Sequence, residues 1–451
     1  MGGVLDLGGC SVTGSIALVQ SHFEELFFAQ DARINGLLAL EGSHLGEGLM
    51  ADGLQVNSDI VLRNGFVAKG EVRLLGAQIG GNLSCSGGRF EVLAGDALSA
   101  DGAAVRGSVF LNEGFRTTGE VRLLGAQIGG NLECRGGRFE VLEGDALSAD
   151  GAVVKGAVFL QDIHPAARFN FSHADVGVLV DDVAAWAPGS VFDGFRYGAI
   201  GGTAPARGAE RLEWLSRQPA AHMGKEDFRP QPWRQLQRVL SEMGHKEDAR
   251  QVGMFYERQL RRAGRVGQSP RDSTQVVSFL KRQAAEALHW AYGFFYGYGY
   301  RPERLLMSLL PAVWLICGAL FWFLALPPRN ALAPSNPLVF QHPAYAECLP
   351  DAKSTPGNWF LCAPLRGEYA TLSPFVYSLD ILLPLVDLGQ EKHWGAYVVT
   401  PKAGAGEELL IHWTWGHAAR LLIWFETLFG WVCSLLLVAI VSGFARRSDE
   451  G

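Results

Sequence analysis

Two cysteines in the last third of the chain have the surroundings of a disulfide pair. Cys348 and Cys362 share a polar stretch, whereas the seven cysteines together contain no CxxC pair and no metal-ligand spacing. The arginines described below place this stretch outside the cytoplasm, in an oxidising compartment where a disulfide persists. We therefore expect a disulfide between Cys348 and Cys362 and no metal centre.

Three carboxylates lie in or beside apolar stretches, where a charge is costly. Asp380 and Asp387 are seven positions apart in the short apolar segment 374–388, so on one helix they would share a face. In an oligomer they could form a ring that attracts cations. The alternative is an outer helix packed on its neighbours, since no TVGYG-like filter is present. Glu426 stands at the entry of the last apolar stretch and is either functional or within reach of lipid headgroups.

A basic cluster ends the middle of the chain, formed by Arg258, Arg261, Arg262 and Arg265. Lipid headgroups are the favoured ligand because an apolar span follows, and a solvated helix end is the alternative. The net charge of -7 and the lack of a basic patch in the sequence of the first two hundred positions argue against nucleic acid as a partner.

Motifs of enzyme active sites are missing from the sequence. The segments GAQIGGN and GAIGG do not open a helix with the G-x-G-x-x-G spacing, and there is no Walker motif, nucleophile elbow or HExxH. We expect neither a catalytic residue nor a cofactor. The sequence favours a non-catalytic protein.

An internal repeat of forty-nine residues determines the expected fold of the N-terminal part. GEVRLLGAQIGGNL begins at Gly70 and returns at Gly119, and RFEVLAGDALSADGA from Arg89 matches RFEVLEGDALSADGA from Arg138. Half a repeat, about 24 residues of strand-sized apolar runs and glycine turns, suits one coil of a parallel β-helix. Residues 1–200 are predicted to form a β-solenoid of about eight coils, capped by the aromatic stretch 186–200. Cys85 and Cys134, two coils apart, should be packing residues.

The rest of the chain is predicted to be helical and membrane-embedded. Residues 205–300 contain a helical hairpin around Gly244 and an aromatic juxtamembrane segment. Residues 301–326 and 421–445 are long enough to cross a bilayer, and 327–420 would form the loop between them. Arginines flank the outer ends of the two spans, and the positive-inside rule then places both termini in the cytoplasm and the loop outside. These arginines are Arg301, Arg304, Arg446 and Arg447.

The combined segments resemble a known bacterial family. The resemblance rests on VRLLGAQIGGNL and its repeat, DGFRYGAI, QPWRQLQRVLSEMGHKEDAR, GYGYRPER and YSLDILLPLVDLGQEKHW. It is a family often labelled membrane-associated oxidoreductase or pentapeptide-repeat-like membrane protein. The resemblance implies a β-solenoid with C-terminal transmembrane helices in the bacterial cytoplasmic membrane. It carries over no catalytic residue, and the oxidoreductase label has no cofactor motif in this sequence.

Three functions are consistent with these patterns. The first is a membrane-anchored scaffold or sensor whose cytoplasmic solenoid binds a protein partner or a second copy of itself. The second is an oligomeric ion channel or pore built from the two spans and segment 374–388. The third is a membrane-associated oxidoreductase, by family label alone. The expected partners are a lipid bilayer and a protein, and no nucleic acid.

Overall fold

The computed structural model describes residues 5–267, 275–301, 304–349, 357–398 and 413–441. The chain divides into two compact units, Met1–Ala287 and Leu288–Gly451. The first unit contains a parallel β-solenoid of about nine turns followed by helices, and the second contains two long apolar helices. The predicted fold class is thus confirmed, with about one turn more than the repeat suggested.

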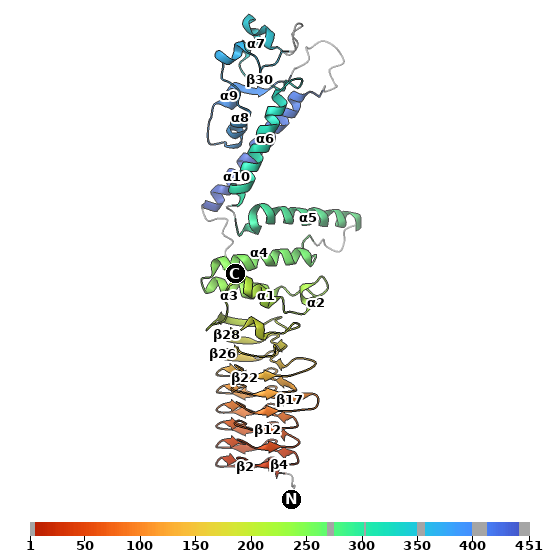
Figure 1. Cartoon of the computed structure of the whole chain (residues 1–451), viewed down its shortest axis with the longest axis vertical. Coiled ribbons are helices and arrows are strands. Elements are labelled where there is room, and N and C mark those ends of the chain that lie inside the picture. Colours follow the sequence, from red (N-terminus) through yellow and green to blue (C-terminus); the bar gives the residue numbers. More distant parts are fainter. Residues whose placement is uncertain (1–4, 268–274, 302–303, 350–356, 399–412, 442–451) are drawn as a thin grey trace. The chain divides into compact units, whose positions relative to one another are not determined.

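Most turns of the solenoid contribute a short strand to each of four columns, and the strands of a column pair in parallel (Figure 1). Leu5 pairs with Phe27 after 22 residues, and Gln78 pairs with Ala104 after 26. A turn of this length agrees with the predicted coil. The variation arises from corner loops of different length rather than from the strands.

The strands of the four columns have the following bounds. The first column contains β1 (Leu5–Asp6), β5 (Phe27–Phe28), β9 (Leu49–Met50), β13 (Val72–Arg73), β17 (Asp96–Ser99), β21 (Glu120–Arg122), β25 (Leu147–Ser148) and β27 (Phe169–Asn170). The second contains β2 (Ser11–Val12), β6 (Arg33–Ile34), β10 (Gln55–Val56), β14 (Gln78–Ile79), β18 (Ala104–Val105), β22 (Gln127–Ile128) and β26 (Val153–Leu160), which also continues the third. The third contains β3 (Ile16–Ala17), β7 (Leu38–Ala39), β11 (Ile60–Val61), β15 (Leu83–Ser84), β19 (Val109–Phe110) and β23 (Leu132–Glu133). The fourth contains β4 (His22–Phe23), β8 (His44–Leu45), β12 (Val67–Ala68), β16 (Arg89–Phe90), β20 (Arg116–Thr117) and β24 (Arg138–Phe139).

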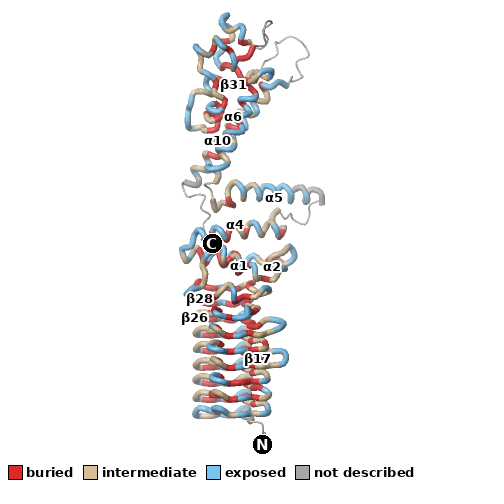
Figure 2. Tube along the Cα trace, in the orientation of Figure 1, coloured by how far each residue is buried: buried red, intermediate tan, exposed pale blue. Residues whose placement is uncertain are grey.

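Buried and exposed residues alternate along the coils (Figure 2), because successive side chains of a strand point to opposite faces. Phe27, Ile34, Leu38 and Leu45 are the inward residues of one turn, and each is at most 1% exposed. The free thiols of Cys85 and Cys134 are also buried in this core, as predicted. Burial raises the pKa of both thiols, so they pack as apolar groups.

An aromatic ladder runs through the core from turn to turn. Its neighbouring ring centroids are 5.2 to 5.9 Å apart, within the range of favourable aromatic contact. The ladder continues from the solenoid into the first helix after it. Its members are Phe66, Phe90, Phe115, Phe139, Phe169, Trp186 and Trp214.

Glycine allows the coils to approach closely at their corners. A Cβ atom added to Gly70 would lie 1.9 Å from the carbonyl oxygen of Glu47 in the preceding turn. No other residue type fits there without moving the backbone. The repeated glycine in this motif is therefore a packing requirement.

Helices cover the end of the solenoid. The last strands are β28 (Asp175–Asp181) and β29 (Arg196–Ile200), followed by α1 (Gly208–Leu215), α2 (Ala220–Met223), α3 (Gln231–Glu242) and α4 (Lys246–Arg262). The side-chain amides of Gln231 and Gln235 donate to the carbonyl oxygens of Phe195 and Tyr197 at 2.9 and 2.7 Å. Residues 186–200 thus form the final turn. Helix α3 covers its open edge by donating hydrogen bonds to backbone carbonyl groups that no further turn can reach.

The predicted helical hairpin is present as α3 and α4, which reverse at Gly244. Trp233, Leu236, Val239 and Leu240 of α3 are buried, so the apolar stripe read from the sequence is the packed face. The next helix, α5 (Gln275–Tyr296), crosses the boundary between the two units.

The second unit is built on two long helices and on the shorter elements that lie between them in the sequence. Its elements are α6 (Leu310–Ala325), β30 (Leu332–Pro334), α7 (Pro337–Gln341), α8 (Pro374–Leu382), α9 (Gln390–His393), β31 (Trp394–Ala396) and α10 (Trp415–Val441). Strands β30 and β31 pair antiparallel. Two stretches, Met307–Ala325 and Trp415–Val438, are long and apolar enough to cross a membrane, and only 22% and 17% of the residues in an apolar 18-residue segment of each are buried.

Candidate functional site

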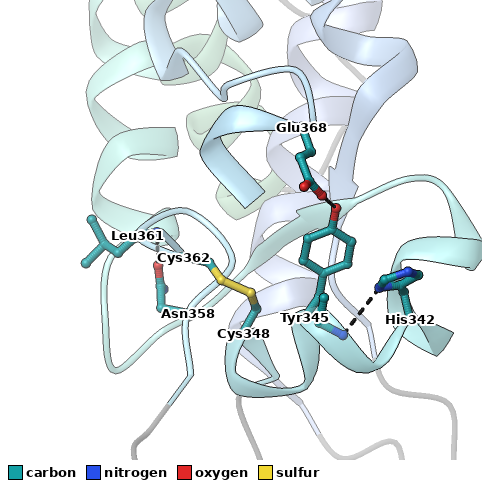
Figure 3. Close-up of a disulfide and its surroundings, with 8 residues drawn as sticks. His342, Tyr345, Cys348, Asn358, Leu361, Cys362 and Glu368 are labelled. Carbon is teal, nitrogen blue, oxygen red and sulfur yellow. Dashed lines mark hydrogen bonds between the residues drawn. A yellow bond between two sulfur atoms is a disulfide. The ribbon is translucent and has the colours of Figure 1, made fainter. Parts of the chain in front are cut away.

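Cys348 and Cys362 form a disulfide in the segment between α6 and α8 (Figure 3). Their Cα atoms are 5.4 Å apart, and both side chains are buried beside Trp359 and Leu365. Asn358 ties the same loop to the end of α6, because its amide donates to the carbonyl oxygen of Ala325 at 2.8 Å. A buried disulfide next to a packed tryptophan has a structural role rather than that of a redox centre.

Helix α8 is wedged between α6 and α10. The indole nitrogen of Trp314 donates to the carbonyl oxygen of Phe375 at 2.8 Å, and the rings of Phe321 and Tyr377 meet edge to face at 5.0 Å. On the other side, a Cβ atom added to Gly430 would lie 2.2 Å from the carbonyl oxygen of Leu382. Small and aromatic residues together thus hold this short helix against both long ones.

Asp380 and Asp387 do not share a helix face. Helix α8 ends at Leu382, two residues before Pro384, because the residue before a proline is restricted to extended conformations. Asp380 is buried and accepts backbone N–H groups of Leu388, Gln390 and Glu391 at 2.6, 2.7 and 2.8 Å. It therefore fixes the loop and the start of α9. The expectation of one helix over 374–388 is wrong in this respect.

Asp387 lies on the exposed loop after α8. It accepts a hydrogen bond from the Lys392 ammonium group and one from the backbone N–H of Gly389 at 2.9 Å. The Lys392 hydrogen bond holds the pKa of this carboxyl below its usual range. Neither aspartate thus presents an unpaired carboxylate for a cation ring within one subunit.

Glu426 lies in the middle of α10, not at the edge of the apolar stretch. The helix begins at Trp415, ahead of the expected boundary at 421, so Glu426 falls midway along Trp415–Val438. Its side chain is fully buried, and its Oε1 atom accepts a hydrogen bond from the Ser378 hydroxyl. Its Oε2 atom is buried without any hydrogen-bond partner. Among the residues that the structure describes, this makes Glu426 the carboxylate with the poorest compensation for burial.

The basic cluster lies at the end of α4 in the first unit. Arg258 and Arg262 are exposed on the helix, and Arg265 is exposed just beyond it. Arg261 is half-buried. Positive side chains at this end also complement the partial negative charge of the helix C-terminus. These arginines therefore stabilise α4 whether or not they contact lipid.

A groove on the side of the solenoid was not expected from the sequence. It has a volume of about 680 Å³ and lies between the corner loop 140–144, residues 165–168 and residues 187–188. Leu142 projects from this loop, and Leu93 projects from the equivalent loop one repeat earlier; both are fully exposed. The signal in the sequence was the extra VLAGD or VLEGD segment, which lengthens the turn and pushes a leucine outward.

Metal chemistry has no evident site in the described ranges, where no group of three or more His, Cys, Asp or Glu side chains is placed to hold an ion.

The fold and the sites define a β-solenoid protein with a separate helical unit apolar enough to enter a bilayer. Comparisons with protein-family models, with curated proteins and with solved structures find no match.

Proposed function

We propose that this protein is a membrane-anchored scaffold or sensor whose solenoid binds a protein partner. The anchoring is supported by the apolar surfaces of α6 and α10, which are mostly exposed. A core helix of a soluble protein would bury such a surface, whereas these helices need a nonpolar solvent around them. Both have the length that a bilayer requires.

The proposed topology places the solenoid in the cytoplasm of a bacterium and the disulfide outside the cytoplasmic membrane. Arg301 and Arg304 precede α6 and favour a cytoplasmic position for that end by the positive-inside rule. The disulfide between Cys348 and Cys362 lies past the opposite end of α6, which suits an oxidising compartment. Arg446 and Arg447, which entered the same prediction, lie outside the described residues.

The proposed docking surface is the side of the solenoid that carries Leu93, Leu142 and the groove. Exposing a whole leucine on a projecting loop leaves apolar area in water, and the chain does so twice at equivalent positions. Ala166, Ala167 and Pro188 give the adjacent groove an apolar wall, and Glu143 lies at its rim. A leucine- or phenylalanine-bearing segment of a partner protein has the chemistry that fits this surface.

The experiment is site-specific photo-crosslinking of the full chain in native membranes. A photoreactive residue at position 142 is expected to give a discrete protein adduct. The substitutions Leu93→Ser and Ala166→Lys should each reduce the yield of this adduct. The matched control is a photoreactive residue at Val19, which is also exposed on the solenoid but distant in sequence from both loops. Equal adducts from positions 142 and 19, or no adduct from either, would overturn the docking proposal.

The membrane proposal has a separate test. Both spans should hold the chain in the membrane pellet after extraction with alkaline carbonate, with or without substitutions in the solenoid. Release of the full chain into the supernatant would contradict it, whatever the outcome of the crosslinking.

A pore is the second candidate, and the seating of α8 between two apolar helices is the observation that favours it. Without a shared face for Asp380 and Asp387, a pore would depend on other side chains. Conductance in bilayers reconstituted with the purified protein, together with a closed oligomer in detergent, would establish this function. A silent monomer would dismiss it.

A further inference from the structure

Two buried carboxylates in the second unit have opposite surroundings. Asp380 accepts three backbone N–H groups, which stabilise the ionised form of a carboxyl group. Glu426 has one hydroxyl partner on Oε1 and no partner on Oε2. An ionised carboxylate with so little compensation is strongly disfavoured in an apolar interior, whereas the neutral acid is tolerated there.

The hydroxyl of Ser378 connects Glu426 to the backbone of α6. Its Oγ atom is hydrogen-bonded to Glu426 and also lies 3.2 Å from the carbonyl oxygen of Trp314. A hydroxyl carries one hydrogen, so it can donate to only one of these two oxygens at a time. With a protonated Glu426, the acid donates to Ser378 and Ser378 donates to Trp314, which satisfies both contacts.

The groups around Glu426 offer no positive charge. Helix α6 presents Cys317 nearby, and α8 presents Tyr377, which is also close to Asp380 and to Glu391 of α9. On α10 itself, Cys433 lies two turns further along the buried side. Among the described residues, no cation pairs with Glu426, so nothing offsets the cost of burying its negative charge.

We propose that Glu426 is a proton-binding site and that its bound proton keeps α8 seated between α6 and α10. Protonation forms an O–H bond on the carboxyl group at the expense of a hydronium ion, which becomes water. Loss of this proton leaves a buried negative charge with a single donor, so water must enter to solvate it. Since Ser378 belongs to α8, the entry of water loosens the contacts of this helix.

The first experiment is infrared spectroscopy of the full chain in lipid nanodiscs at neutral pH. The carbonyl stretch of a protonated carboxylic acid should be present, should shift in D₂O and should be lost in Glu426→Gln. Asp387→Asn, which changes an exposed and ion-paired carboxylate, should keep the band. A spectrum without the band, or a band that persists unchanged in Glu426→Gln, would overturn the proposal.

A second variant keeps the test valid if Glu426→Gln fails to fold. Ser378→Ala retains Glu426 and removes its hydrogen-bond partner, so the carboxylic-acid band should move to higher frequency. An unmoved band would show that the protonated group is not the one that contacts Ser378, which would also overturn the proposal.

The seating of α8 is tested with the native thiol of Cys317, which is buried in the same core. Its alkylation by a maleimide is followed by peptide mass spectrometry between pH 6 and pH 9. In the unsubstituted protein the rate should rise with pH more steeply than in Glu426→Gln. Equal pH dependence in both proteins would show that the proton does not control the packing of α8.

Discussion

Asp181 at the end of β28 and Arg211 of α1 form a fully buried ion pair that joins the solenoid to its helical cap. The two guanidinium nitrogens of Arg211 donate to the two carboxylate oxygens of Asp181 at 2.7 and 3.0 Å. The indole nitrogen of Trp186 donates to the same carboxylate at 2.7 Å. A second pair, Arg73 and Asp52, joins two turns on the surface at 2.8 Å, with side chains that are 31% and 27% exposed.

Asp181→Ala should destabilise the first unit far more than Asp52→Ala. Removal of Asp181 leaves the buried charge of Arg211 uncompensated, which costs about 3–5 kcal/mol. The surface pair is screened by water, and its loss should cost at most about 1 kcal/mol. The measurement is the thermal unfolding of the β-rich transition by circular dichroism of the full chain in detergent. Similar shifts for the two variants would contradict the assigned role of the buried pair.

Phe115→Ala should be much more destabilising than Phe110→Ala in the same turn. Phe115 belongs to the aromatic ladder and is completely buried, so its truncation leaves a cavity that costs about 3–5 kcal/mol. Phe110 is the outward residue of β19 and is only half-buried. The same unfolding measurement compares the two variants. A larger effect of Phe110→Ala would contradict the assignment of Phe115 to the inward face of this turn.

Cys348 and Cys362 should resist alkylation by maleimide until a reductant is added, and a linked peptide should appear in non-reducing mass spectrometry. The Cys348→Ser, Cys362→Ser variant should lose about 3 kcal/mol of stability in the second unit, as expected for a closed loop of this length. Cys10 is the internal control because it is free and exposed. Free thiols at both positions in protein from intact cells would contradict the pairing or the outward location of the loop.

Periodicity made most of the fold accessible from the sequence. The copies that begin at Gly70 and Gly119 revealed the coil, because a solenoid repeats the same inward residues and the same corner glycines. The stripe from Trp233 to Leu240 revealed the packed face of α3 for a similar reason. Both signals are local, so they are visible without the tertiary structure.

The sites were less accessible because they depend on contacts between distant segments. The partner of Glu426 is Ser378, and nothing in the apolar run around either residue indicates that contact. Hydropathy alone also predicts too late a start for α10. The helix begins at Trp415 and includes Arg420, whereas the apolar stretch begins after this arginine. Asp387 lies beyond α8 because Pro384 ends this helix, and the proline is a signal for that boundary in the sequence itself.

The glutamines of α3 have a consequence for how the length of this protein can change. Gln231 and Gln235 contact the backbone of the last turn, at Gly194, Phe195 and Tyr197, so these contacts do not depend on the number of turns upstream. Duplication of one forty-nine-residue copy would insert two turns and lengthen the rod by about 9.6 Å, with both of its ends unaltered. The near identity of the copies at Gly70 and Gly119 is what such an event leaves behind. The length of the solenoid is thus a quantity that this architecture can adjust in fixed increments.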